Sequence, residues 1–438
     1  MSSQLLRRTY SLSNLEAAWR VIHANGRLSQ SEEVRAEIQQ FSEDVYRNLR
    51  SLQYRLTRDK FDFPAAKGIP IPKLDVRGKP TGKFRPIVLA PLASRIVQRA
   101  VLNILLEVPK LQPFIKTPYS FGGLRAQREI EPSQLSPAGI LSAVPAAIDA
   151  ALAEIARGAT YCATADIKGF FTKVPKSTVS QIISEAVCDA AFTEFLQKAI
   201  SVELSNMAVL REKALEFPLE SVGVAQGNSL SPLLGNIILA DFDAQMNNSD
   251  CACFRYIDDF IIFAPSRKAA TARLEKAKRL LAQLGMELSP EKSSKGPQPI
   301  SEGFEFLGIE ICPGLIRPSR KAQRALLEKV DIVVADGRKA LISIRNGQKI
   351  ERDLTFLAVL RRLDVTISGW GKHYWFCNDR AVFKALDQKI WKRVHSYLGC
   401  YSEVRDRLTD DHRPIALGLT QLRLGTREPF AYPKTTET

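Results

Sequence analysis

The sequence predicts an α+β fold, in which a small antiparallel sheet packs against helices. A strand candidate at 159–167 is followed by helical stretches and then by two short apolar runs, 251–254 and 260–264, on either side of a tight turn. Paired apolar runs around a turn are typical of a β-hairpin, whereas apolar residues three and four apart are typical of amphipathic helices. We expect one antiparallel sheet, with the end of the first strand beside the hairpin tip.

The elements before this sheet are mostly helical. Apolar residues recur at three and four spacing over 15–23 and 34–52, which predicts two helices. The segment 63–73 is interrupted by prolines and a glycine, so it must be extended, and 83–90 is expected to return beside it. Residues 94–106 follow as an amphipathic helix.

The elements that follow the first sheet strand alternate helices with strands. Helices are predicted over 178–200, 231–246 and 267–284, the last ended by Gly285. Residues 304–311 alternate apolar and polar side chains, which predicts a single strand. The chain beyond is expected to be mostly helical.

The charge of the chain predicts a polyanionic partner. The 438 residues suit two or three domains, and the net charge is +15 with a pI near 9.5. Between 310 and 400 there are 18 Lys and Arg against 9 Asp and Glu, so this region carries +9 of the excess. A bias of that size exceeds what solubility needs and favours nucleic acid.

Cysteine usage and hydropathy indicate the compartment. The seven cysteines show no metal-ligand spacing, their number is odd, and the chain opens with no apolar leader. We therefore expect reduced thiols in a cytoplasmic protein. No apolar run approaches the ~20 residues of a membrane span, which excludes a membrane partner.

Two adjacent acids occupy the hairpin tip, in Tyr256-Ile257-Asp258-Asp259. Carboxylates between apolar strands are costly to pack unless a cation neutralises them, and Mg²⁺ prefers such oxygen ligands. A surface Asp-Asp turn is the simpler alternative. Because Asp166 stands near the end of the earlier strand, the predicted sheet brings a third carboxylate to the tip. Three such acids are what two-metal phosphoryl transfer requires.

Several short motifs, spread over about residues 60 to 400, resemble those of bacterial group II intron-like reverse transcriptases and follow that family's order. They are Lys73, 85–87, 94–100, 119–122, 166–171, 225–233, 256–259, 291–292 and 303–308. The resemblance implies a right-hand polymerase with fingers, an antiparallel palm sheet and a helical thumb. It also implies an RNA-directed DNA polymerase that makes cDNA from dNTPs on a structured RNA.

The resemblance implies five parts of the chain. They are an N-terminal helical extension at 1–60, fingers with part of the palm at 61–155, a palm with a fingers insertion at 156–312, a basic helical thumb at 313–405, and a C-terminal tail at 406–438.

The family's acids map onto the hairpin and the strand before it. Asp166 and Asp258 match the principal ligands of two Mg²⁺ ions, for which Mn²⁺ can substitute. The Ile167 carbonyl matches a backbone ligand, and Asp259 a supporting acid.

Other matched residues would handle the incoming nucleotide. Lys73 and Arg85 match the residues that hold the triphosphate, although the long gap between them leaves Lys79 or Lys83 as substitutes for Lys73. Phe171 matches the gate that excludes a ribose 2′-hydroxyl. A core role is its alternative, since only one of Phe170 and Phe171 can face the site.

Three further residues also match nucleotide-binding positions. Gln226 and Gly227 match the element under the template–nucleotide pair, with a helix lead-in turn as the alternative. Lys292 matches a general acid for pyrophosphate, with a solvated lysine as the alternative.

Primer and template contacts are implied by the later motifs. Tyr256, Phe306 and Gly308 match the hairpin and the primer grip, although Phe306 also fits an ordinary sheet core. Cations of the thumb would contact phosphates. They are Arg317, Lys372, Lys392 and Arg393. The aromatic rings among them are assigned to packing, and they are Trp370, Tyr374, Trp375 and Trp391.

The lineage within the family rests on local variants. The segments 225–229 and 316–319 are similar to the domesticated "unknown group" enzymes, many of which act in antiviral (anti-phage) defence with a partner noncoding RNA. The alternative is an intron-encoded reverse transcriptase and maturase acting in splicing and mobility.

Two other functions remain open on the sequence. An RNA-binding splicing cofactor with an incidental polymerase site is one, and an RNA-synthesising polymerase, which Phe171 disfavours, is the other. The sequence leaves open the template, the priming group and the oligomeric state.

Overall fold

The computed structural model describes residues 3–74, 80–124, 128–130, 139–141, 143–290, 293, 296–420 and 430. The chain divides into two compact units, Met1–Ile300 and Ser301–Thr438. Among the described residues, no helix is both long enough and apolar enough to cross a membrane.

Four helices open the first unit. They are α1 (Gln4–Thr9), α2 (Leu12–Gly26), α3 (Glu32–Ser42) and α4 (Val45–Thr57). The single helix expected over 34–52 was wrong, because Asp44 interrupts it and its side chain accepts a hydrogen bond from the N–H of Arg47 as the N-cap of α4. Leucines of α2 and α4 form a core with α5 (Leu92–Leu105).

The extended segment and its return form a hairpin, as predicted. Strands β1 (Lys67–Leu74) and β2 (Pro80–Leu89) are antiparallel, with Ile71 opposite Arg85. After α5 come η1 (Pro109–Leu111), α6 (Gln112–Ile115), the paired strands β3 (Arg128–Ile130) and β4 (Gly139–Leu141), and α7 (Ala143–Ala156).

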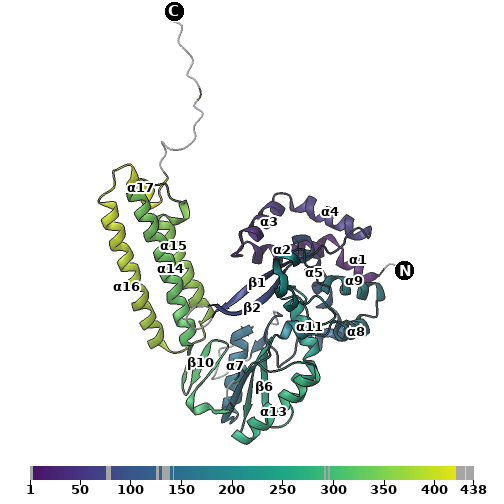
Figure 1. Cartoon of the computed structure of the whole chain (residues 1–438). Helices are drawn as coiled ribbons and strands as arrows, with labels where there is room; N and C mark the ends of the chain where they lie inside the picture. The colour runs from purple at the N-terminus through teal and green to yellow at the C-terminus, as the bar shows by residue number, and fades with distance from the viewer. Residues whose placement is uncertain are drawn as a thin grey trace, which may run out of the picture. The chain divides into compact units, whose positions relative to one another are not determined.

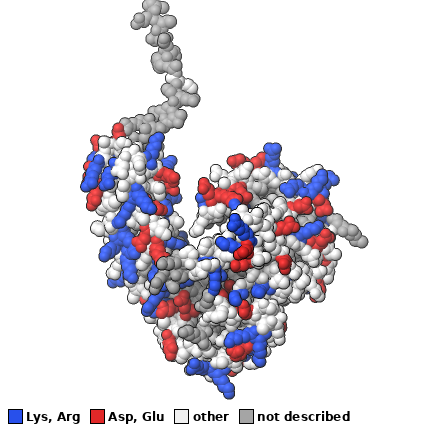
Figure 2. Space-filling model, viewed as in Figure 1, with Lys and Arg blue, Asp and Glu red and all other residues white. Residues whose placement is uncertain are grey.

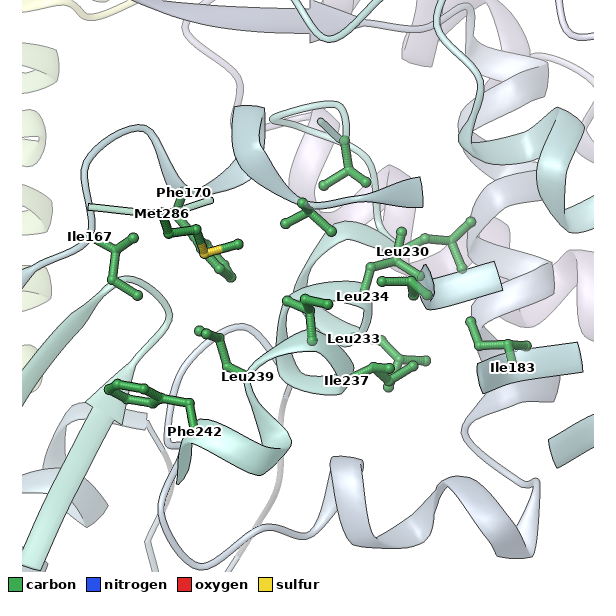
Figure 3. Packing of buried hydrophobic residues seen from close by; sticks show 14 of the residues in the cluster. Ile167, Phe170, Ile183, Leu230, Leu233, Leu234, Ile237, Leu239, Phe242 and Met286 are labelled. Carbon is green, nitrogen blue, oxygen red and sulfur yellow. The ribbon is translucent and has the colours of Figure 1, made fainter. Parts of the chain in front are cut away.

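The predicted antiparallel sheet is confirmed. It has the order β6-β7-β5-β8, with β5 at Tyr161–Asp166, β6 at Ala252–Tyr256, β7 at Asp259–Ala264 and β8 at Gln298–Pro299. All residues of β7 after Asp259 are buried. Helices α11 to α13 share a core with the sheet, part of which Figure 3 shows around Phe170, Leu234 and Met286.

Two of the predicted helices are each divided. The stretch 178–200 forms α8 (Lys176–Val187) and α9 (Ala190–Ile200), because Cys188 adopts a left-handed conformation and Asp189 caps α9. The stretch 231–246 forms α11 (Ser231–Ile238) and α12 (Ala240–Met246), which part at Leu239. Helix α13 (Arg267–Gln283) ends just before Gly285, which has φ +69°.

Short helical turns complete the first unit and its border with the second. They are η2 (Phe170–Lys173), α10 (Met207–Leu210), η3 (Arg211–Glu216), and η4 (Ile300–Glu302).

The second unit opens with a three-stranded antiparallel sheet. The single strand expected over 304–311 was wrong, because Leu307 and Gly308 turn the chain with φ of 52° and 77°. Strands β9 (Phe304–Phe306), β10 (Ile309–Cys312) and β11 (Leu315–Pro318) result, in the order β11-β10-β9.

Long helices form the rest of the second unit, as expected. They are α14 (Arg320–Arg345), α15 (Phe356–His373) and α16 (Arg380–Arg405), with the short η5 (Arg352–Leu354) and α17 (His412–Leu417). Helix α14 packs against both α15 and α16 (Figure 1). Trp370 packs against the core that these helices share, and Tyr374 is buried, as expected. Trp375 and Trp391 are 55% and 61% exposed, so the assignment of these two rings to packing was wrong.

The outer edge of β6 is closed by the chain itself. The side chain of Asn247 accepts a hydrogen bond from the N–H of Cys253 (2.8 Å) and donates to its carbonyl (2.9 Å). Two residues further along β6, the N–H of Arg255 donates to the carbonyl of Tyr119, and the carbonyl of Arg255 accepts from the N–H of Phe121. The strand therefore leaves no open edge at these positions for another chain to pair with.

Replacing Asn247 should destabilise the sheet. Asn247→Ala leaves the buried N–H and C=O of Cys253 without their partners, so we expect the free energy of unfolding to fall by about 2 kcal/mol in urea. Gln245→Ala is the control, because that side chain bonds only Asp241 at the surface. Equal losses for both variants would contradict the role of Asn247.

Candidate active site

Three carboxylates meet at the end of the central sheet. One oxygen each of Asp166, Asp258 and Asp259 lies within 4.8 Å of the others. Strand pairing explains the approach, since Asp166 ends β5 directly opposite Asp259, and the N–H of Ile167 donates to the carbonyl of Asp258 at 3.0 Å. Asp166 is only 4% exposed, whereas the other two acids are more open.

The turn that carries Asp258 is strained. Ile257 and Asp258 alone join β6 to β7, and Ile257 has φ +62°, in a position where such turns normally hold glycine. A β-branched residue in this conformation is a real outlier, and such strain persists only where its surroundings impose it. Gly122 provides one constraint, because a Cβ there would lie 2.8 Å from the Ile257 side chain.

A buried arginine provides the second constraint on the turn. Arg255, 1% exposed, donates from Nη1 to the carbonyl of Ile257 at 2.9 Å. Its Nε and Nη2 bind both carboxylate oxygens of Asp243 at 2.9 and 2.6 Å, and Nη2 also reaches Asn236. The guanidinium therefore ties the strained turn to α11 and α12.

The sequence interpretation missed Arg255. The available signal was a single cation inside an apolar run directly before the paired acids, since an arginine buried in a strand needs a carboxylate partner.

The backbone around Asp166 is held on its other side as well. The N–H of Ser289 donates to the Asp166 carbonyl at 2.7 Å, and the N–H of Lys168 to the carbonyl of Glu287. The ammonium of Lys168 pairs with the Glu287 carboxylate at 2.7 Å, which lowers the pKa of that carboxyl. Ile167, expected to offer a carbonyl ligand, is fully buried between these segments.

The two adjacent phenylalanines face different surroundings. Phe170 is buried against Gly235, where a Cβ would lie 2.8 Å from its ring, whereas Phe171 is only partly buried. The carbonyl of Phe171 accepts a bond from the N–H of Val224 at 2.7 Å. Of the pair, Phe170 is thus the core residue, and the backbone of Phe171 pairs with the segment that holds Gln226.

Backbone contacts bring Gln226 and Gly227 beside the strand of Arg85. The carbonyl of Gln226 accepts from the N–H of Val88 at 3.0 Å. Gly227 has φ +118°, and a Cβ there would lie 3.1 Å from the Val88 carbonyl, so only glycine suits this approach.

The cations expected near a triphosphate lie on the β1–β2 hairpin. Arg85 is exposed on β2, and Lys73 is exposed at an irregularity in the register of β1. Lys83 is exposed on β2 as well. Lys79 and Lys292 lie outside the described residues.

Predicted primer and template residues have mixed surroundings in the second unit. Phe306 is 4% exposed, as its alternative role in the sheet core requires. Arg317 pairs with Glu310 at 2.6 Å and Asp379 at 3.5 Å, and these partners raise its pKa.

Among the cations predicted to contact phosphates from the second unit's helices, one is bound to a carboxylate and two are exposed to solvent. Arg393 binds both oxygens of Asp331 at 2.6 and 3.1 Å, whereas Lys372 and Lys392 are exposed.

In the first unit, Tyr256 ends β6 beside the acids and is partly buried, which raises its pKa.

The acids fit a divalent cation. Three carboxylate oxygens converge, and hard cations such as Mg²⁺ favour oxygen ligands. Among the described residues, this is the one group of three or more such side chains that converges closely enough to hold a metal.

An antiparallel sheet with paired acids on a hairpin and a third at an adjacent strand end defines a polymerase-type palm. The family model "Reverse transcriptase (RNA-dependent DNA polymerase)" matches residues 71–311, more than half of the chain. The chain therefore belongs to the reverse transcriptase family.

Individual relatives are distant. Protein YkfC of Escherichia coli (strain K12) is 26% identical, with 53% of this chain and 64% of that protein covered. An uncharacterized 91 kDa protein in a cob intron of Schizosaccharomyces pombe is 25% identical, over 44% of this chain and 20% of its own length. The chain thus spans less than two thirds of either relative.

Solved structures with some likeness are also distant. A partial Cas6-RT-Cas1–Cas2 complex is 19% identical with a TM-score of 0.34, covering 64% of this chain and 42% of that one. Apo telomerase from Candida tropicalis is 12% identical with a TM-score of 0.41, covering 79% and 67%.

Removing Arg255 should reduce nucleotide incorporation by more than the loss of folded protein accounts for. Arg255→Met leaves Asp243 buried without its cation and should cost about 3–5 kcal/mol of unfolding free energy. In Arg255→Met/Asp243→Leu the buried charge is gone, so stability should largely return. We expect incorporation by this folded double variant to stay about tenfold or more below wild type, because Ile257 has lost its donor.

Arg273→Met is the control for this prediction. Arg273 is another buried arginine, which bonds carbonyls at the end of α12 and Asn248, away from the turn. Its loss should lower stability without changing the rate per folded molecule. If the double variant regains full incorporation along with stability, Arg255 contributes to folding only.

Proposed function

We propose that this protein is an RNA-directed DNA polymerase that adds deoxynucleotides to a primer along an RNA template. The observation that carries the proposal is the convergence of Asp166, Asp258 and Asp259 within the part of the chain that matches the reverse transcriptase family.

The acids are proposed to hold two Mg²⁺ ions, for which Mn²⁺ can substitute. Asp166 and Asp258 would be the principal ligands, the Ile167 carbonyl a backbone ligand, and Asp259 a supporting acid. When bound, such ions activate the attacking hydroxyl and neutralise the leaving pyrophosphate. The chain contributes by fixing Asp258 through the bonds of its turn to Ile167 and Arg255.

The incoming nucleotide is proposed to lie between the β1–β2 hairpin and the acids. Arg85 and Lys73 would meet the triphosphate, a role that the exposure of both cations on this hairpin supports. Gln226 and Gly227 would underlie the base pair, and Lys292 would protonate the leaving pyrophosphate. The neighbourhood of Gln226 and β2 supports the first of these roles.

Phe171 is proposed as the gate against ribonucleotides. Its backbone is bonded to Val224, two residues before Gln226, and its ring is the more exposed of the adjacent pair. A ring in this position would clash with a 2′-hydroxyl.

The five parts of the chain keep their proposed roles. Residues 61–155 would be fingers, 156–312 palm and 313–405 thumb, with 1–60 and 406–438 as N-terminal extension and C-terminal tail. In the thumb, Lys372 and Lys392 are the best candidates for phosphate contacts, because Arg317 and Arg393 already pair with carboxylates.

The biological role is proposed from sequence variants. The segments 225–229 and 316–319 support synthesis of cDNA on a partner noncoding RNA in antiviral defence. The relative named for a cob intron favours the alternative, a reverse transcriptase and maturase acting in intron splicing and mobility. Sequencing the RNA and DNA that copurify with the protein decides between them, since the second requires intron RNA.

Neutralising one acid should stop synthesis without abolishing RNA binding. Asp258→Asn keeps the shape of the side chain but removes its charge, so primer extension should fall by at least about a thousandfold. Asp250→Asn, an exposed acid just before the same hairpin, is the control and should extend normally. Substantial synthesis by Asp258→Asn would refute the two-metal proposal.

Shortening the proposed gate should relax sugar selection. Phe171→Ala should incorporate ribonucleotides at least about tenfold better relative to deoxynucleotides, because the ring no longer meets the 2′-hydroxyl. Single-nucleotide incorporation with each sugar measures this ratio, and Phe171→Tyr, which keeps the ring, should leave it low. Efficient use of ribonucleotides by the wild type would contradict the gate.

A further inference from the structure

Helix α4 presents an outward face made of arginine and tyrosine. Between residues 45 and 58 there are four arginines and no Asp, Glu or Lys. All four arginines are exposed, and they are Arg47, Arg50, Arg55 and Arg58. Tyr46 and Tyr54 lie among them and are 60% and 57% exposed.

The opposite face of α4 is fully used by the fold. Leu49, Leu52 and Leu56 are buried in the core shared with α2 and α5. The helix is therefore anchored through its leucines, and the arginine–tyrosine face is left to solvent. Figure 2 shows blue side chains in this part of the surface.

The tyrosines and arginines form an ordered row. Tyr46, Arg50, Tyr54 and Arg58 follow each other four residues apart, so they lie on one side of the helix. The guanidinium of Arg50 lies 5.3 Å from the Tyr46 ring centre, and that of Arg58 lies 5.9 Å from the Tyr54 ring centre. The two rings are about 12 Å apart along the axis.

The four guanidinium groups are not neutralised by acids. Within the described part of the chain, none of them forms an ion pair, and the nearby Asp44 carboxylate caps the helix backbone. Arg50 donates from Nε and Nη2 to the Tyr46 hydroxyl at 3.0 and 2.9 Å and from Nη1 to Gln53, which are neutral partners that leave its charge uncompensated. By contrast, the guanidinium groups of Arg393 and Arg317 are bound to carboxylates. The α4 face thus has donors and ring surfaces to offer a ligand.

We propose that the Arg/Tyr face of α4 binds the single-stranded part of a structured RNA. Guanidinium forks match phosphate oxygens, and exposed tyrosine rings are stacking platforms for unpaired bases. A membrane surface fits less well, because the leucines of α4 are buried and Val45 is partly buried against the same core, so no fully exposed aliphatic side chain of α4 is available to insert. The choice of RNA rests on the proposed function, in which the enzyme copies an RNA.

The test compares two pairs of substitutions in the full chain. Arg50→Ala/Arg58→Ala removes two phosphate contacts, and Tyr46→Leu/Tyr54→Leu removes two stacking rings. The probe is a labelled hairpin RNA with a single-stranded extension, titrated at several salt concentrations. We expect about tenfold weaker binding for each pair.

The salt response separates the two contributions. The arginine pair should lower the slope of log affinity against log salt by about 0.7–0.9 for each lost phosphate contact, whereas the tyrosine pair should leave the slope unchanged. Arg267→Ala/Lys268→Ala is the matched control, since it removes the same charge from an exposed position on α13. It should retain wild-type affinity.

Primer extension on a short unstructured template separates this proposal from the proposed function. All three variants should extend like wild type, because none touches the acids or the nucleotide site. An inactive wild type would refute the polymerase proposal and leave the binding result standing. The inference would be overturned if both α4 pairs kept the RNA affinity of the wild type, or if the α13 control lost as much affinity as they do. It would also be overturned if the α4 pairs lost binding only to phosphatidylserine vesicles.

Discussion

The antiparallel register of β5 against β7 is the constraint on which the candidate site depends. It sets Asp166 opposite Asp259, and the bond from Ile167 to the Asp258 carbonyl carries the pairing into the turn. A shift of one residue would turn Asp166 to the other face of the sheet. Because both faces of β7 are buried, such a shift would also exchange the side chains that pack on each face and disturb their fit, so the core of the unit enforces the geometry of the acids.

The hairpin tip shows how a stable core supports a strained turn. Ile257 occupies a conformation that its branched side chain disfavours, and the surroundings impose it through Gly122 on one side and Arg255 on the other. Arg255 is itself buried with Asp243, an arrangement in which the attraction of the pair offsets the loss of hydration only when every bond is made. The acids therefore stand on a backbone with little freedom to adjust.

The sequence alone led to the sheet, its hairpin and the three acids. Apolar runs and turn residues are local signals, and the acids stand beside strong ones. The same reasoning merged adjacent helices at Asp44 and Cys188 and missed the turn at Leu307. A capping residue or a residue in the left-handed conformation ends a helix or strand, but it leaves the spacing of the apolar residues in the sequence unchanged. It assigned Arg317 and Arg393 to phosphate contacts without finding their carboxylate partners, since an ion pair between residues 62 apart, as in Arg393–Asp331, leaves no local trace.

What the sequence determined by itself is the chemistry available, namely three carboxylates, an aromatic residue after the first of them and a large cationic excess. Only the tertiary structure decided which of these residues meet. It buried Phe170 and left Phe171 more open, bonded Gln226 to the strand of Arg85, and set Arg255 beneath the turn. The physical reason is that these contacts join segments far apart in the chain, and their geometry depends on how the whole core packs.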